Sequence, residues 1–274
     1  MKAEEYFAHI QEYGLLAKKE VGQNFLVNTD ACKRIVDALD IEEGDKVLEI
    51  GVGAGSLTYF LSLAPASIEG IDIDEAMVTK LNEDFKEKDN LNIHMGNAMR
   101  FEYACYQKIV GNLPYYVTSG ILERVLLGAT NAKKAVFMVQ QEAANRFLSK
   151  PGSKDYGPLP ILLSLSGNAK KLFNVGRNSF VPIPNVDSSV FEIVFNPDRG
   201  DLSFLYWLCE QLFLNRRKTI LNNLKNVTKN ADFAMILLQN AGILPTLRPE
   251  QIAPESYLLL SKDEKLVQLR KKKQ

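Results

Sequence analysis

The sequence has few of the residues that build metal sites and disulfides. It contains only two histidines and three cysteines, Cys32, Cys105 and Cys209, which are far apart and form no C-x-x-C pair. Because a tetrahedral metal site needs several such ligands together, we expect no metal and no disulfide framework. Unpaired cysteines also fit a reducing compartment, so we expect a cytoplasmic protein.

Long apolar runs are missing as well. None approaches the roughly 20 residues that a membrane span needs. The first 13 residues carry acidic side chains in place of the apolar core of a secretory signal. We therefore expect neither a membrane protein nor a secreted one, and 274 residues are enough for one large domain and a smaller one.

The net charge of zero hides an asymmetry along the chain. Residues 1–199 carry 21 basic and 26 acidic residues, whereas residues 200–274 carry 12 and 7, a net charge of +5. A segregated basic segment is typical of a protein that binds a polyanion. Taken alone, the last basic run, residues 270–273, is better explained as a solvated tail than as a surface that binds a polyanion.

Strand-like and helix-like segments alternate through the first two-thirds of the chain. We expect strands at 46–50, 67–73, 91–95, 107–110, 135–139, 169–175 and 189–195, and helices at 56–63, 75–86 and 119–127. This alternation predicts a parallel α/β sheet with helices on both faces. In such sheets the ligand binds beyond the carboxyl ends of the strands.

A turn-forming segment at residues 196–200 divides the chain. We expect one domain over residues 1–198 and an all-helical domain over residues 199–274. The helical pattern of the second domain predicts helices at 202–214, 216–226, 230–241 and 255–268.

A glycine-rich segment, Glu49-Ile-Gly51-Val-Gly53-Ala-Gly55, places its three glycines directly after the first predicted strand. Its glycines permit a tight turn and a close approach of a ligand to the backbone. Asp72 ends the next strand, where a carboxylate can accept hydrogen bonds from ribose hydroxyls. The two features predict a nucleoside cofactor and do not by themselves choose between NAD and S-adenosylmethionine.

The segment Asn112-Leu-Pro-Tyr115 follows the fourth predicted strand. It places an amide, a rigid proline turn and an aromatic ring at the carboxyl edge of the sheet. The Asn112 amide oxygen and the Leu113 carbonyl can accept the two hydrogens of an adenine amine, while Tyr115 stacks on the base. Taken alone, the segment fits a β-turn with a packed tyrosine about equally well.

These segments resemble the motifs of the adenine dimethyltransferases that act on ribosomal RNA, which include the kasugamycin-sensitivity enzymes and the erythromycin-resistance methyltransferases. Residues 112–115 resemble their catalytic motif. Four other segments match in order: residues 22–26 resemble the N-terminal cofactor motif, 49–58 the glycine-rich loop, 180–188 the target-base loop and 215–219 the start of the C-terminal helical domain. The resemblance covers nearly the whole chain. It implies a Rossmann-like, seven-stranded S-adenosylmethionine-dependent methyltransferase domain followed by a small helical RNA-binding domain.

The resemblance also implies a role for individual residues. The residues expected to bind the cofactor are Asn24, Leu26, Gly51, Gly53, Asp72, Asn97 and Asn112. The residues expected to act on the target base are Asn112, Leu113, Pro114, Tyr115 and Phe180, with the Phe180 ring stacking opposite Tyr115. Position 97 departs from the family, which usually has aspartate there, and the asparagine oxygen makes a neutral and weaker hydrogen bond.

Basic residues stand at the start of the helix predicted at 216–226, where they oppose the helix dipole. Phosphate contacts by Arg216, Arg217 and Lys218 would explain them, although a solvated face remains open. Lys18 and Lys19 could add further phosphate contacts.

The resemblance implies dimethylation of the 6-amino groups of two adjacent adenosines near the 3′ end of 16S ribosomal RNA. The expected substrate is an immature 30S particle, and the expected enzyme is a monomer that uses S-adenosylmethionine. Two alternatives stay open: a large-subunit RNA methyltransferase that confers macrolide resistance, and a non-catalytic RNA-binding assembly factor that has kept the fold.

Overall fold

The computed structural model describes residues 2–14 and 24–271. Its contacts divide the chain into two units, one of residues up to 144 with 169–197, the other of residues 145–168 with 198–274. The segment 145–168 therefore groups with the C-terminal helices. The division into a catalytic domain, residues 1–198, and an RNA-binding domain, residues 199–274, stays a prediction.

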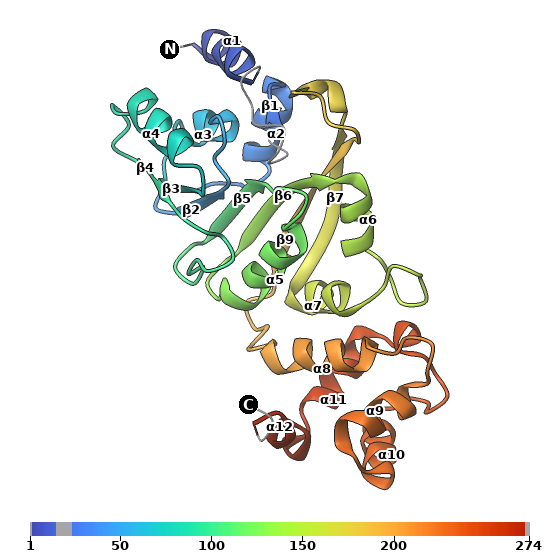
Figure 1. The fold of residues 1–274 in the computed structure, drawn as a ribbon. Helices are drawn as coiled ribbons and strands as arrows, with labels where there is room; N and C mark the ends of the chain where they lie inside the picture. The colour runs from blue at the N-terminus through green and yellow to red at the C-terminus, as the bar shows by residue number, and fades with distance from the viewer. Residues whose placement is uncertain (1, 15–23, 272–274) are drawn as a thin grey trace. The chain divides into compact units, whose positions relative to one another are not determined.

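A seven-stranded sheet is the main element of the first unit (Figure 1). Its strands lie in the order β4-β3-β2-β5-β6-β9-β7. Their bounds are β2 Lys46–Ile50, β3 Ser67–Asp72, β4 Leu91–Met95, β5 Lys108–Asn112, β6 Lys134–Gln140, β7 Gly167–Val175 and β9 Ser188–Phe195. Strands β2 to β6 pair in parallel, and β9 pairs with β6 in the antiparallel direction. The predicted Rossmann-like, seven-stranded α/β fold is confirmed.

The middle of the sheet forms because its strands are apolar on both faces. Val47, Leu48, Ile109 and Val110 are all fully buried, as expected for parallel strands that are covered on both sides. The bounds of the helices in this unit are α1 Ala3–Gly14, α2 Thr29–Asp37, α3 Ser56–Leu61, α4 Glu75–Asp84, α5 Thr118–Gly128 and α6 Gln141–Phe147, of which α6 runs into the second unit.

A second, two-stranded sheet joins segments that are far apart in the sequence. Strand β1 (Phe25–Leu26) pairs with β8 (Phe180–Val181) in the antiparallel direction, with Leu26 opposite Phe180. The short helix η2 (Arg177–Ser179) precedes β8, and the Val27 amide donates to the Ser179 carbonyl at 2.8 Å. This ladder ties the predicted N-terminal cofactor motif to the predicted target-base loop.

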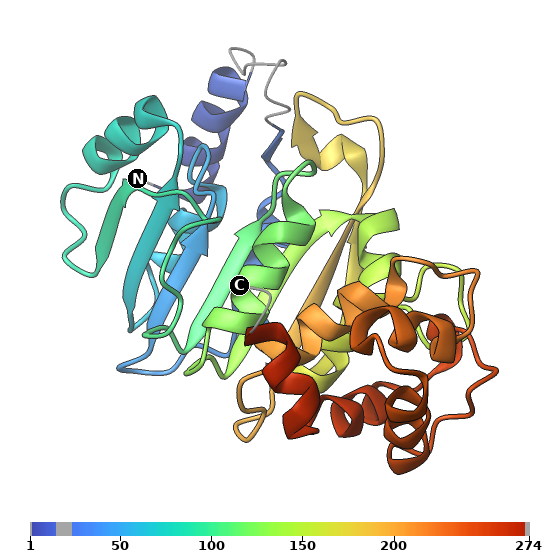
Figure 2. The same ribbon diagram turned by 60° about the horizontal axis from the view of Figure 1, so that its bottom comes forward.

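The second unit is helical (Figure 2). Its helices are α7 Pro158–Ser166, α8 Ser203–Phe213, α9 Ile220–Thr228, α10 Ala231–Asn240, η3 Pro249–Gln251, α11 Pro254–Ser261 and α12 Glu264–Lys271. Two buried tyrosines fix the segment around η3, because Tyr156 donates to the Ile252 carbonyl at 3.1 Å and Tyr257 donates to the Pro249 carbonyl at 2.8 Å. The all-helical pattern predicted for residues after 199 is confirmed.

Two predicted helices in this unit are wrong in their bounds. The helix expected from residue 216 begins at Ile220, with Thr219 as its N-cap. The buried Asn223 side chain donates to the carbonyls of Asn215, Lys218 and Thr219, which holds the preceding residues in a turn. The single helix expected at 255–268 is two helices, α11 and α12, and the Asp263 carboxylate caps the second by accepting from the Leu266 amide at 3.0 Å.

Two further structural findings concern the described residues only. No helix among them is long and apolar enough to cross a membrane. They also contain no group of three or more histidine, cysteine, aspartate or glutamate side chains that could hold a metal ion.

Candidate active site

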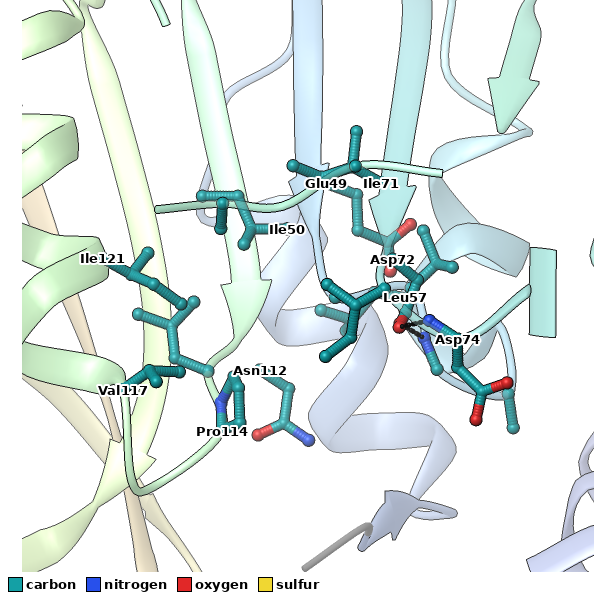
Figure 3. Close-up of a pocket in the computed structure, with 18 of the residues that line it drawn as sticks. Glu49, Ile50, Leu57, Ile71, Asp72, Asp74, Asn112, Pro114, Val117 and Ile121 are labelled. Atoms are coloured by element: carbon teal, nitrogen blue, oxygen red, sulfur yellow. Dashed lines mark hydrogen bonds between the residues drawn. The ribbon is translucent and has the colours of Figure 1, made fainter. Parts of the chain in front are cut away.

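A cavity of about 600 Å³ lies beyond the carboxyl ends of β2, β3 and β5 (Figure 3). Its volume is in the range of sites for small-molecule ligands. The last residue of each strand lines it: Ile50, Asp72 and Asn112. The cavity therefore occupies the position where parallel α/β sheets bind their ligands.

Asp72 fixes the glycine-rich loop to the neighbouring strand. Its Oδ2 accepts a hydrogen bond from the Gly53 amide at 2.9 Å, and its Oδ1 accepts one from the Asp74 amide at 3.0 Å (Figure 3). Each carboxylate oxygen has a further lone pair. The half-buried carboxylate can therefore hold the loop and still accept hydrogen bonds from two ribose hydroxyls.

The backbone of the glycine loop adopts a conformation that side chains disfavour. Gly51 and Gly53 have φ angles of +74° and +50°, in the left-handed region that glycine tolerates best. The Gly51 amide donates to the Ile71 carbonyl at 2.8 Å. The loop therefore presents bare backbone to the cavity, which allows a ligand to approach it closely.

The segment Asn112–Tyr115 forms a braced turn at the end of β5. The Asn112 side-chain nitrogen lies 3.5 Å from the Asn24 carbonyl, to which it donates. The Leu113 amide donates to the Met138 carbonyl at 3.0 Å, and Thr118 Oγ1 donates to the Pro114 carbonyl at 2.8 Å. Asn112 and Leu113 take part in these bonds only as donors, through the side-chain nitrogen of Asn112 and the backbone amide of Leu113. The Asn112 side-chain oxygen and the Leu113 carbonyl can therefore still accept hydrogen bonds from an amine.

Tyr115 is half-buried in the wall of the cavity. Its hydroxyl lies 3.5 Å from Ser188 Oγ. Ser188 is the last residue of the predicted target-base loop, residues 180–188, so this contact joins that loop to the turn at the end of β5. A ring held at its hydroxyl end can still offer a face to a planar base.

The structure brings most of the predicted site residues together around this cavity. Those that line it are Asn24, Leu26, Gly51, Gly53, Asp72, Asn97, Asn112, Leu113, Pro114 and Tyr115. Asn97 is exposed, and its side-chain oxygen accepts a hydrogen bond from the Met99 amide at 2.9 Å. An amide oxygen has a second lone pair, so this local bond does not prevent Asn97 from accepting another. The role of each of these residues stays a prediction.

Other predicted residues lie elsewhere. Phe180 does not line the cavity and is only 1% exposed, because the pairing of β8 with β1 places it in the apolar core beside Leu26. Its stacking on a base stays a prediction and requires the ring to become exposed. Lys18 and Lys19 lie outside the described residues. Arg216, Arg217 and Lys218 are exposed in the second unit, between α8 and α9.

The structure adds a buried carboxyl for which the sequence suggested no role. Glu49 is 1% exposed and lines the cavity. Burial raises its pKa to about 8; the hydrogen bond from Thr58 opposes this shift, and the charge of Asp72 adds to it. The Thr58 hydroxyl donates to Glu49 Oε2 at 2.7 Å. Two features of the sequence could have marked it: Glu49 is a charged residue inside a predicted apolar strand, which is unusual, and it is the first residue of the motif at 49–58.

The cavity suits an adenosine-containing cofactor on three grounds. Asp72 has a carboxylate that could accept from ribose hydroxyls, the glycine loop exposes its backbone, and Asn97 lines the cavity together with the apolar residues Ile73 and Met99. A ribose, an adenine and a charged methionine end are the parts of S-adenosylmethionine that such groups would hold.

Comparisons with known proteins show the family to which the chain belongs. The model of the ribosomal RNA adenine dimethylase family matches residues 14–264. A protein from Lactobacillus helveticus named ribosomal RNA small subunit methyltransferase A is 33% identical, over 93% of each chain. A solved dimethyladenosine transferase from Plasmodium falciparum matches with a TM-score of 0.75 and 26% identity, over 90% of this chain and 97% of that one. The 23S rRNA methyltransferase ErmE, with a TM-score of 0.65 and 23% identity over 87% and 98% of the two chains, shows likeness of fold alone. The chain belongs to the ribosomal RNA adenine dimethylase family.

Proposed function

We propose that this protein is an S-adenosylmethionine-dependent enzyme that dimethylates the 6-amino groups of adenosines in small-subunit ribosomal RNA. One observation carries the proposal: in a member of this family, the glycine loop held by Asp72 and the turn Asn112–Tyr115 line the same cavity. The relatives named as small-subunit methyltransferases support the choice of RNA.

The residues of the turn would prepare the adenine amine for reaction. The lone pair of this amine is delocalised into the ring, which makes it a poor nucleophile. Acceptance of its two hydrogens by the Asn112 side-chain oxygen and the Leu113 carbonyl would favour a pyramidal nitrogen. The bound cofactor supplies a methyl group made electrophilic by a positively charged sulfur. Water can take the proton that the methylated amine releases.

Orientation is the main contribution of the protein to this reaction. Pro114 fixes φ at the turn, and the Thr118 hydroxyl, which donates to the Pro114 carbonyl, braces it from the next helix. Tyr115 would stack on the base. Groups held in place before the reaction need no reorganisation during it, and this lowers the barrier.

The finer proposal concerns the substrate. We infer two adjacent adenosines near the 3′ end of 16S ribosomal RNA, in an immature 30S particle, as the substrate of a cytoplasmic monomer. A base inside an RNA helix cannot reach a cavity of this kind, so each target would have to be extruded. The exposed residues Arg216, Arg217 and Lys218 would bind RNA phosphates. Their exposure and the +5 charge of residues 200–274 support this role.

The decisive experiment measures methyl transfer from tritium-labelled S-adenosylmethionine to immature small subunits that lack the modification. Digestion and mass spectrometry should then find dimethyladenosine at two adjacent positions near the 3′ end. Transfer to large-subunit RNA instead would support the macrolide-resistance alternative. Cofactor or RNA binding without any transfer would support a non-catalytic assembly factor.

A further inference from the structure

Helix α1 contacts α3 and, through Tyr6, the glycine-rich loop that precedes α3. Both ribbon views draw it in dark blue (Figures 1 and 2). Its apolar face carries Tyr6, Phe7 and Ile10, each 3% exposed in the core of the first unit. Ala54, whose carbonyl accepts a hydrogen bond from Tyr6, lines the cavity. The helix is therefore a neighbour of the cofactor site, although no motif of the sequence includes it.

Tyr6 is the residue of α1 that contacts the loop directly. Its hydroxyl donates to the Ala54 carbonyl at 3.1 Å. Its ring stacks on Tyr59 of α3, with centroids 5.1 Å apart, and meets Phe85 edge-on at 5.5 Å. Burial raises the pKa of Tyr6 well above its ordinary value, so the hydroxyl keeps its proton and remains a donor.

The hydrogen bond to Ala54 completes the constraint on one peptide group. The carbonyl of the Ala54–Gly55 peptide accepts from Tyr6, and its amide, which belongs to Gly55, donates to the Val52 carbonyl at 2.9 Å. Both polar ends of the peptide plane are therefore bonded, which prevents its rotation. The same loop is held on the cavity side by the bond from Gly53 to Asp72.

The fit between Tyr6 and the loop is tight. Gly55 has a φ angle of +86°, and a Cβ atom built there would lie 2.2 Å from the Tyr6 hydroxyl oxygen. A real Cβ atom cannot approach that closely. Both the conformation of the loop and the position of the hydroxyl thus depend on the absence of a side chain at residue 55.

We propose that Tyr6 is a positioning residue for cofactor binding, whose hydroxyl holds the Ala54–Gly55 peptide so that the glycine loop keeps the shape that the cofactor needs. The inference rests on the proposed function only in taking S-adenosylmethionine as the ligand of this loop. Without the hydroxyl, the buried Ala54 carbonyl loses its donor. The peptide can then rotate toward other partners, and the loop is no longer preformed.

Tyr6→Phe tests this role because it removes the hydroxyl and keeps the ring in place. By calorimetry, we expect the variant to bind S-adenosylmethionine roughly five- to tenfold more weakly. The KM for the cofactor should rise by the same factor, while kcat at saturating cofactor and the affinity for RNA stay within twofold. A general loss of folding would not produce that split.

Tyr156→Phe is the matched control. Tyr156 is also a buried tyrosine whose hydroxyl donates to a backbone carbonyl at 3.1 Å, but it lies in the second unit. Both variants should lose similar thermal stability, and only Tyr6→Phe should show a smaller rise in Tm on addition of S-adenosylmethionine. This shift can be measured even if a variant is less stable.

The outcomes separate the inference from the proposed function. If wild type and Tyr6→Phe bind the cofactor equally, or if both variants lose affinity equally, the positioning role is wrong. If the wild type binds S-adenosylmethionine but transfers no methyl group to small-subunit RNA, the proposed function fails. The role of Tyr6 would then still be decided by the binding measurements.

Discussion

Replacing the buried Glu49 by glutamine should change how the stability of the protein depends on pH. In the folded protein, burial raises the pKa of Glu49 to about 8, whereas the ordinary value is 4.5. In the unfolded chain the carboxyl is in water and has its ordinary value. Between these two pH values, the folded protein holds a proton that the unfolded chain has released.

The magnitude follows from proton linkage. When the folded state binds more protons than the unfolded state, the free energy of unfolding falls as the pH rises. For one group the slope is at most about 1.4 kcal/mol per pH unit, and it ends above the folded pKa. Glutamine cannot ionise, and its oxygen can still accept the hydrogen bond from Thr58. Relative to wild type, Glu49→Gln should therefore gain little at pH 5 and on the order of a few kcal/mol at pH 8.

The assay is chemical unfolding of the ligand-free protein at several pH values between 5 and 9. The difference between variant and wild type at each pH cancels the titration of the other groups. Glu192→Gln serves as the control, because Glu192 is also buried but pairs with Lys134 at 3.1 Å and Lys170 at 3.0 Å. That variant should not gain stability as the pH rises. Parallel curves for wild type and Glu49→Gln would refute the reasoning.

Three other variants test the site and the RNA surface. Asn112→Ala should stay folded and lose roughly 100- to 1,000-fold in the rate of methyl transfer, the cost of one preorganised polar group in other enzymes; near wild-type transfer would exclude Asn112 from catalysis. Asn97→Asp should bind S-adenosylmethionine tighter by about 1 kcal/mol in calorimetry, since the acceptor becomes charged; an unchanged affinity would place residue 97 outside the adenine pocket. Replacing Arg216, Arg217 and Lys218 by glutamine should reduce the slope of log RNA affinity against log salt by about 2 to 3, at 0.7–0.9 per phosphate contact. The same triple variant should bind the cofactor as wild type does, and an unchanged salt slope would remove these residues from the RNA surface.

The sequence predicted the sheet because local signals and tertiary burial agree there. Strands β2 and β4 have the predicted bounds, 46–50 and 91–95. Short apolar runs between turn-forming residues predict strands, and here the sheet pairs both of them as the local pattern indicates. The place of the cavity followed from the same pattern. Glycines after the first predicted strand, Asp72 at the end of the second and Asn112 after the fourth must meet at one edge of a parallel sheet.

The features that were missed depend on contacts between distant parts of the chain. Tyr6 reaches a carbonyl 48 residues away, and nothing near it in the sequence marks it as part of a cofactor site. Phe180 is buried by a two-residue strand paired with β1, which is too short for periodicity to reveal. For both residues, function depends on which surface the ring faces, and only the assembled core determines that.

The basic residues between α8 and α9 show how a corrected helix boundary changes an argument about function. At the start of a helix, Arg216, Arg217 and Lys218 would oppose its dipole, and RNA would have to explain them. In the structure they follow the end of α8 at Phe213 and precede the N-cap Thr219. Cations near the C-terminus of a helix are stabilising by roughly 0.3–1 kcal/mol each. A basic residue there thus has a structural use of its own.

Helix stabilisation and phosphate binding nevertheless make different demands on the turn. Stabilisation of the α8 dipole requires only positive charge near the end of the helix, whatever the conformation of the turn. Phosphate contacts require the three basic side chains to be held in a fixed arrangement. The side-chain nitrogen of Asn223, which is 1% exposed, donates to three carbonyls of this turn and so fixes its backbone. A fixed turn favours phosphate binding as the reason for the three basic residues. If the dipole were the whole reason, the triple glutamine variant would lose thermal stability and keep its salt slope. Loss of the slope with little change in Tm would assign the three residues to RNA.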